Sequence, residues 1–178
     1  MRRDDPKITV YYEWLDPLLK KIPLSETVKD YLDSISRMPR QELAVFAAHC
    51  CDAEICNGGL LQLFYNPTGI VVPEAYDGYM AVGKPELAAI VQRAANLLGE
   101  PYPRGWEERQ EALLESSGKS LLEVEQIAED AEHPYLGFQK VVEEMDFDKL
   151  SNEYYQNAIR WFFDEAGAAL ISQIRTQH

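Results

Sequence analysis

The chain has 178 residues, of which 46% are hydrophobic and ten are tyrosines, and its net charge is −13. The apolar content excludes a disordered acidic tail, and the strong negative charge argues against direct nucleic-acid binding. A chain of this length can bury a sizeable core as one domain. We therefore expect residues 1–178 to form a single compact domain.

Helical periodicity dominates the chain from residue 25 onward. Ser25 is a candidate N-cap for a helix over 25–37, where apolar residues recur at helical spacing. The next helix, over 39–56, is apolar around nearly its whole circumference, which predicts a central and buried position. Further helices are expected over 85–99 and 153–174.

Strand signals are few, so the predicted fold class is all-α. The apolar run over 69–73 permits either one minor hairpin near Ile70–Val72 or a buried loop. The loop over 99–105, rich in glycine and proline, divides the chain into two parts. Both parts contain amphipathic helices, so the pattern does not indicate two independent domains.

The three cysteines, Cys50, Cys51 and Cys56, cannot all pair with one another. The sequence begins with basic residues but meets Asp4 and Asp5 instead of an apolar signal segment. Its longest apolar-rich run is far shorter than the roughly 20 residues that span a bilayer. We therefore expect reduced thiols, a cytoplasmic protein and no membrane partner.

Three patterns that could carry chemistry fail on their spacing. Residues 116–120 contain Gly-Lys-Ser but lack the glycine that a phosphate-binding loop needs five positions earlier. Asp130 and His133 have the spacing of a di-metal bundle site, without a second such pair. His49 and the cysteines of the same helix cannot converge on one zinc ion. We therefore expect no metal and no cofactor.

Two adjacent glycines lie between two apolar helical runs. We expect Asn57 and Gly58 to end the first helix, because both residue types tolerate a left-handed conformation after the last turn. A second helix begins almost at once, and its first N–H groups need acceptors. Glu54 lies on the inward stripe of the first helix, and we expect its carboxylate to accept from the backbone near Gly59 and Leu60. This interpretation makes Glu54 structural.

The alternative is an enzyme in which Glu54 acts as a general base with His49 or Tyr65 nearby, because burial can tune a carboxylate for that role. The sequence places no second acid, nucleophile or metal set beside Glu54. We therefore favour a structural corner and predict no catalytic residue.

The excess negative charge is concentrated in one stretch of the chain. Residues 1–99 carry 13 acidic and 10 basic side chains, whereas residues 100–165 carry 17 acidic and 6 basic ones, a net charge of −11. Acidic residues recur there three or four positions apart, which places them in rows along helix faces. The candidate partner-binding residues are Glu107, Glu108, Glu111, Glu115, Glu125, Glu129, Glu132, Glu143, Glu144 and Asp148.

The glycine-pair segment contains the pattern E-x-x-N-G-G-x-x-Q-x-x-Y-N, formed by Glu54, Asn57, Gly58, Gly59, Gln62, Tyr65 and Asn66. The segment AVGKPELAAIVQRAANLLG follows over 81–99, then Arg109, then DFDKLSNEYYQ over 146–156. Together these residues resemble the bacterial DNA-mimic protein (DMP) domain family, most strongly over 40–156. Family members often carry an aromatic residue just after the glycines, where this chain has two leucines.

The resemblance implies a helical, dimeric acidic protein that occupies the DNA-binding surface of a transcriptional regulator. The mimicry would reside in dispersed surface acids and not in the glycine motif. Rows of carboxylates can face the Arg and Lys side chains that normally meet phosphates, and the aromatic residues over 154–163 could serve both a core and a dimer interface. An acidic adaptor or inhibitor of another basic protein would use the same charges, so the sequence leaves that alternative open.

Overall fold

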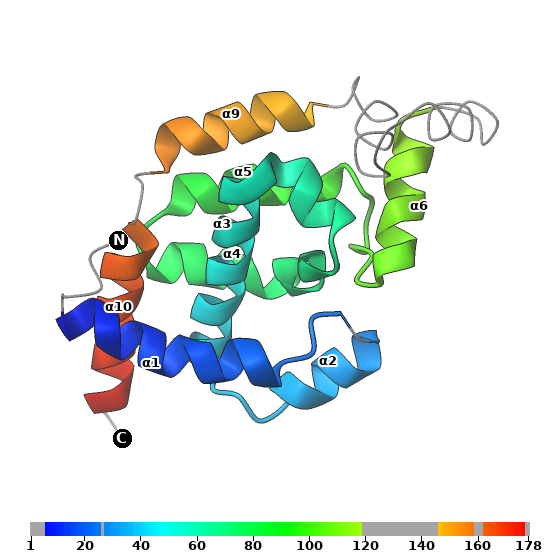
Figure 1. Ribbon diagram of the computed structural model, residues 1–178. Coiled ribbons are helices and arrows are strands. Elements are labelled where there is room, and N and C mark those ends of the chain that lie inside the picture. Colours follow the sequence, from blue (N-terminus) through cyan, green and yellow to red (C-terminus); the bar gives the residue numbers. More distant parts are fainter. Residues whose placement is uncertain (1–5, 26, 119–145, 159–161, 177–178) are drawn as a thin grey trace.

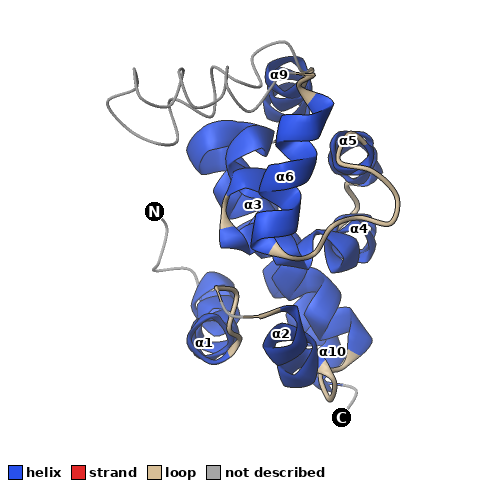
Figure 2. Ribbon diagram, turned by 90° about the vertical axis from the view of Figure 1, so that its right-hand side faces the viewer, coloured by secondary structure: helices blue, strands red, loops and turns tan. Residues whose placement is uncertain are grey.

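The computed structural model describes residues 6–25, 27–118, 146–158 and 162–176. All regular secondary structure in these residues is helical, so the predicted all-α fold class is confirmed (Figure 2). The elements are α1 (Pro6–Lys21), α2 (Val28–Ile35), α3 (Arg40–Tyr65), the 3-10 helix η1 (Pro67–Val71), α4 (Val72–Ala81), α5 (Pro85–Asn96), α6 (Trp106–Ser116), α9 (Phe147–Asn157) and α10 (Phe162–Thr176).

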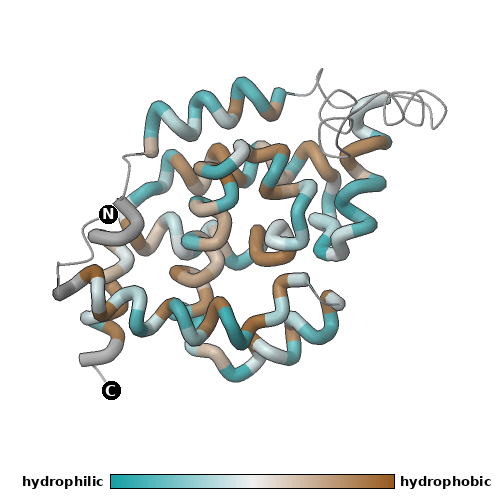
Figure 3. The backbone as a smooth tube through the Cα atoms, viewed as in Figure 1, coloured by the Kyte–Doolittle hydropathy of each residue, from teal (hydrophilic) through white to brown (hydrophobic). Residues whose placement is uncertain are grey.

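Helix α3 runs through the middle of the molecule, and the other helices pack around it (Figure 1). Val45, Phe46, Ala47 and Cys51 of α3 have no solvent exposure. The hydropathy colours show α3 as more apolar than α6 and α9 (Figure 3). A helix can be buried on all sides only if apolar residues surround it. The prediction of a central buried helix over 39–56 is confirmed for its middle, whereas Arg40, Gln41, Ala53 and Cys56 are exposed.

The remaining helices pack in pairs around α3. Helices α1 and α10 contact each other, and both described ends of the chain lie on that side of the molecule (Figure 1). Helices α4 and α5 contact each other, and α9 contacts both α3 and α5. Helix α6 contacts α3 and η1, which places it beside the C-terminal end of α3.

The hairpin expected near Ile70–Val72 is wrong, because residues 67–71 form η1 and α4 begins at Val72. The Gly69 N–H donates to the Asn66 carbonyl at 3.1 Å, which closes a helical turn in place of a strand ladder. Ile70 and Val71 are buried in that turn. A short apolar run does not distinguish a buried strand from a buried helical turn by its periodicity.

The single helix expected over 153–174 is also wrong. Helix α9 ends at Asn157, and Ala158 has an extended backbone with φ −80° and ψ 116°. The chain changes direction there because α9 packs against α3 and α5, whereas α10 packs against α1. Both helices contact α3, but α9 also packs against α5 and α10 packs mainly against α1.

Candidate functional site

Helix α3 is interrupted at the glycine pair. Gly58 has φ −157° and ψ 24°, and Gly59 has φ 81° and ψ −179°, so neither residue is helical. The positive φ of Gly59 is one that residues with a Cβ atom adopt only with strain. The chain therefore turns at the pair and resumes its helix at Leu60, as the corner interpretation requires.

Side chains of α9 satisfy the backbone groups that this interruption leaves unpaired. The Leu60 N–H donates to the Ser151 hydroxyl oxygen at 3.0 Å, and Ser151 donates to the Phe147 carbonyl at 2.7 Å. The Tyr155 hydroxyl donates to the Ile55 carbonyl at 2.7 Å. The expectation that Glu54 accepts from the Leu60 N–H is therefore wrong, because a serine distant in sequence occupies that position.

Glu54 instead binds two side-chain amides from beyond the interruption. Its Oε1 atom accepts a hydrogen bond from Gln62 Nε2 at 3.3 Å and a second one from Asn66 Nδ2. Gly58 is exposed, and a Cβ atom there would lie 1.9 Å from Gln62 Oε1. Asn57 is exposed as well. The motif residues therefore join the two halves of α3 through polar contacts across the glycine pair.

His49 and Glu54 have different partners in the described residues. His49 Nδ1 forms a hydrogen bond with the Tyr11 hydroxyl at 2.9 Å, between α3 and α1. Burial lowers the pKa of His49 to about 4, so its imidazole is neutral at pH 7. Glu54 binds the amides of Gln62 and Asn66 at the C-terminal end of the same helix. The structure does not bring the two residues together as an acid–base pair.

Arg109 of α6 is completely buried and binds backbone carbonyl groups. Its Nε donates to the Phe64 carbonyl at 3.1 Å, and Nη2 donates to the carbonyls of Asn66 at 2.8 Å and Pro67 at 3.2 Å. Nη1 donates to the Arg104 carbonyl. The last carbonyls of a helix carry partial negative charge, which compensates a buried cation. Arg109 thereby fixes α6 against the end of α3.

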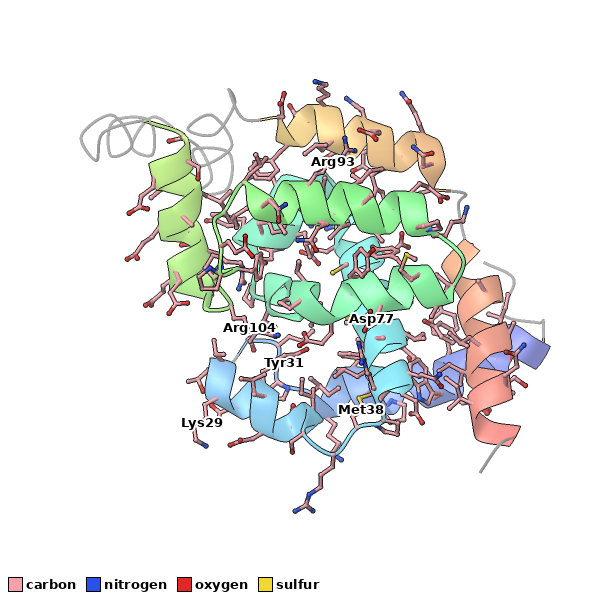
Figure 4. All side chains as sticks on the ribbon, turned by 180° about the vertical axis from the view of Figure 1, so that it is seen from behind. Lys29, Tyr31, Met38, Asp77, Arg93 and Arg104 are labelled. Carbon is pink, nitrogen blue, oxygen red and sulfur yellow. The ribbon has the colours of Figure 1, made fainter. Side chains whose placement is uncertain are left out.

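A second arginine fixes the loop that precedes α6. Arg104 forms a two-pronged ion pair with Glu74 of α4, with N–O distances of 3.0 and 2.6 Å. The Tyr31 hydroxyl of α2 donates to the same carboxylate at 3.1 Å, and Tyr31 and Arg104 lie near each other in Figure 4. The Tyr102 hydroxyl also donates to the Gly69 carbonyl at 2.8 Å. This loop is therefore tied to α2, η1 and α4.

The outer face of α6 carries a row of exposed carboxylates. Glu107, Glu111 and Glu115 are spaced four residues apart, and Glu108 lies beside them in the first turn. Arg109 is the only basic residue of this helix, and it is buried. None of the four glutamates forms an ion pair with another described residue.

The other acidic candidates are only partly described. Asp148 is exposed in the first turn of α9. The remaining candidates lie outside the described residues: Glu125, Glu129, Glu132, Glu143 and Glu144. The described part of the predicted surface therefore consists of α6 and the start of α9.

The sequence matches the family described as DMP19-like protein over residues 36–172. The chain belongs to the DMP19-like family. This family is one of DNA-mimic proteins, and the match confirms the resemblance seen in the sequence. No match was found among curated proteins or among solved structures.

The DMP19-like match begins after α2 and includes the glycine pair, α6 and α9. It therefore covers Glu54 and its amide partners, the Ser151 contact with Leu60, and the anchor at Arg109. Helix α1, whose Tyr11 forms a hydrogen bond with His49, lies before the matched residues.

The described residues offer little for metal or thiolate chemistry. They contain no group of three or more His, Cys, Asp or Glu side chains that could hold a metal ion. All three cysteines are free thiols, and burial raises the pKa of Cys50 to about 12 and that of Cys56 to about 11. These thiols are protonated at neutral pH and are poor nucleophiles. Among the described helices, none has both the length and the apolar character needed to cross a bilayer.

Proposed function

We propose that this DMP19-like chain acts as a DNA mimic, which binds the DNA-binding surface of a transcriptional regulator or another basic DNA-binding protein and blocks its DNA binding. Membership of a DNA-mimic family supports the proposal. The concentration of negative charge over residues 100–165 supports it independently of that membership. A surface of this sign repels nucleic acid and attracts the proteins that bind it.

The observation that carries the proposal is the separation of charge on α6. Elsewhere ion pairs neutralise acids on several elements, as between Arg40 and Asp77 at 2.6 Å and between Arg93 and Glu153 at 2.6 Å. On α6 the only base is buried among carbonyl groups, and the exposed glutamates have no described cation beside them. Within the described part of the chain, the charge on this face is not neutralised by an ion pair.

The spacing of the α6 carboxylates is compatible with the phosphates of a duplex. Residues four apart on a helix are separated by about 6 Å along its axis. Double-stranded DNA carries roughly one charge per 1.7 Å of axis, so a row on one helix reproduces part of that density. Arg and Lys side chains that meet phosphates can pair with carboxylates in the same way.

Helix α6 is held rigidly at both ends, which lowers the entropy lost on binding. At its start the Trp106 Nε1 donates to the Tyr65 carbonyl at 2.6 Å. At its end the Ser116 hydroxyl donates to the Leu97 carbonyl at 2.9 Å. Arg109 anchors the middle of the helix. The proposed binding surface is therefore preorganised.

The deciding experiment is competition between this protein and operator DNA for one regulator. Regulators retained from native cytoplasm at low salt and released at high salt are purified, and their affinity for operator DNA is measured with and without this protein. A mimic excludes the operator, and its own complex weakens as salt rises. A regulator that binds its operator with unchanged affinity while carrying this protein would contradict the proposal and favour an acidic adaptor.

Charge variants make the competition specific to α6. Changing Glu107, Glu111 and Glu115 to Gln removes three charges and keeps helix propensity, so folding is retained and affinity falls by about three- to a hundredfold. The matched control removes three charges elsewhere, from Asp33, Asp77 and Glu86, which already have ion-pair partners. Equal loss in both variants would contradict a role for the α6 face.

One further set of acids belongs to the proposal and lies outside the described residues. Changing Glu125, Glu129 and Glu132 to Gln tests the acids that the sequence spaces along one face of an expected helix. We also propose that the protein is a homodimer, as the family resemblance implies.

No contact among the described residues favours the enzyme alternative, because Glu54 and His49 contact different groups.

A further inference from the structure

Trp106, the first residue of α6, has an unusual combination of exposure and order. Its side chain is 48% exposed, the largest value among the exposed large hydrophobic residues described. Its Nε1 atom, the only polar atom of the ring, donates to the Tyr65 carbonyl at 2.6 Å. The hydrogen bond fixes one edge of the indole while much of the ring meets solvent.

Trp14, the other tryptophan whose side chain is described, has a different environment. Trp14 is 4% exposed, lies in the core and donates its Nε1 to Glu42 Oε2 at 2.9 Å. The Tyr65 carbonyl that holds Trp106 also accepts a longer hydrogen bond from Gln110 Nε2, at 3.5 Å. Trp106, unlike Trp14, is not part of the hydrophobic core.

The surroundings of Trp106 favour a cation. Glu107 follows it directly and Glu108 comes next, and both are exposed in the first turn of α6. The positive charge of Arg109 is buried and is bound by carbonyl groups. An aromatic ring attracts a cation through its negatively polarised face, most strongly in tryptophan, and neighbouring carboxylates add to that attraction.

We propose that Trp106 receives an arginine side chain of the bound DNA-binding protein, whose guanidinium stacks on the indole while neighbouring cations meet the α6 carboxylates. This inference rests on the proposed function and adds a specificity determinant to it. Arginine fits better than lysine because its guanidinium is planar, weakly hydrated and able to stack. Binding hot spots are enriched in Trp and Arg for the same reasons.

The indole gives this protein a property that a row of phosphates lacks. Phosphates attract arginine and lysine mainly by charge, and that attraction weakens as salt rises. An indole adds attraction that depends on ring stacking and excluded water. Trp106 therefore selects among basic proteins by their arginine content at one place, in addition to their net charge.

The test uses deca-arginine and deca-lysine as probes, with affinities measured by calorimetry over about 50–200 mM salt. We expect the intact protein to bind deca-arginine more tightly. In Trp106→Leu this ratio of affinities falls about two- to tenfold, while the salt dependence of both peptides is unchanged. Trp106→Phe, which keeps a weaker aromatic face, gives an intermediate ratio.

Tyr76 of α4 provides a matched control, because it is 43% exposed and lies on a different helix. Tyr76→Leu retains the arginine preference of the intact protein. Thermal unfolding of each variant checks that the fold is kept. Trp106→Leu and Trp106→Phe both lose the hydrogen bond to the Tyr65 carbonyl, so the difference between them reports the aromatic face. A Trp106→Leu variant with an unchanged ratio, or an equal fall in Tyr76→Leu, would overturn the inference.

The two proposals fail in distinguishable ways. Suppose that Trp106→Leu lowers the arginine preference but the intact protein does not exclude operator DNA. The DNA-mimic proposal is then contradicted, and the arginine site at Trp106 binds another basic protein. Suppose instead that operator DNA is excluded but Trp106→Leu leaves the ratio of deca-arginine to deca-lysine affinity unchanged. The DNA-mimic proposal is then supported, and residues other than Trp106 determine its specificity.

Discussion

The Ser151 hydroxyl accepts a hydrogen bond from the Leu60 N–H at 3.0 Å, although the two residues are 91 positions apart in the sequence. Leu60 is the first residue after the glycine pair, where a new helical segment needs acceptors for its N–H groups. Ser151 thus performs the role of an N-cap from another helix. The packing of α9 on α3 and the completion of the second half of α3 depend on each other.

Ser151→Ala tests this contact. The variant leaves the buried Leu60 N–H without its acceptor, so the free energy of unfolding should fall by about 1–2 kcal/mol, measured by urea denaturation. Ser36→Ala is the control, because Ser36 is exposed and its bond to the Asp33 carbonyl can be replaced by water. Equal losses would show that the Leu60 contact contributes nothing specific.

Gly59→Ala tests the interruption of α3. Its φ of 81° is strained for alanine, and the added Cβ would lie 3.0 Å from Ser151 Oγ. Gly83→Ala is a matched control, because Gly83 has φ 74° and no atom within 4 Å of the added Cβ. Backbone strain of about 1–2 kcal/mol is expected in both variants, with a larger loss of stability for Gly59→Ala. Identical losses would contradict a close contact with α9.

Arg109→Met tests the anchor of α6. The change leaves several buried carbonyl groups without a donor, and we expect a loss of about 3–5 kcal/mol in stability, with α6 detached. Arg109→Lys should recover little of it, because an ammonium group cannot reproduce the planar fork of donors. The control is Arg93→Met, which removes an exposed ion pair with Glu153 and should cost less than about 1 kcal/mol. Chemical denaturation measures all three.

His49 makes stability depend on pH in one window. Burial lowers its folded pKa to about 4 from an ordinary value of 6.5, so between these values only the unfolded chain takes up the proton. Stability therefore falls as pH drops from 6.5 to 4, by up to about 3 kcal/mol, and His49 contributes no pH dependence above 6.5. The many carboxylates titrate in both proteins, so the difference between the intact chain and His49→Gln isolates this effect. Parallel pH profiles would contradict it.

The homodimer is tested by light scattering at micromolar concentration, where the expected mass is twice that of the chain. Of the aromatic residues considered for the interface, Tyr154 is fully buried and Tyr155 is 43% exposed, whereas the side chains of Trp161, Phe162 and Phe163 lie outside the described residues. If Tyr155 contributes, Tyr155→Ala weakens association. A monomeric mass would contradict the prediction.

Local features of the fold were predictable from the sequence. The glycine pair predicts a turn because glycine adopts positive φ without strain. The apolar residues around the whole circumference of the helix over 39–56 predict its burial. The N-cap of α2 shows the usual error at a helix boundary, since Thr27 accepts from the Asp30 N–H where Ser25 was expected.

Long-range contacts were not predictable in the same way. Nothing in the spacing of residues connects Ser151 with Leu60, and the sequence alone indicates the nearest acid, Glu54, as the acceptor for that N–H. The burial of Arg109 was equally hidden, because arginine is almost never fully buried unless it is paired. Its spacing of four residues from Leu113, which is also buried, was the only local signal.

The attachment of α6 through Arg109 has a consequence for how this surface can diversify. The inner face holds the helix with backbone carbonyl groups as acceptors, which every sequence possesses. The outer glutamates take no part in that attachment, apart from the Glu108 bond to the Gly105 N–H. Substitutions on the outer face can therefore change the charge of this surface without moving the helix, and under the proposed function they would change which proteins bind there.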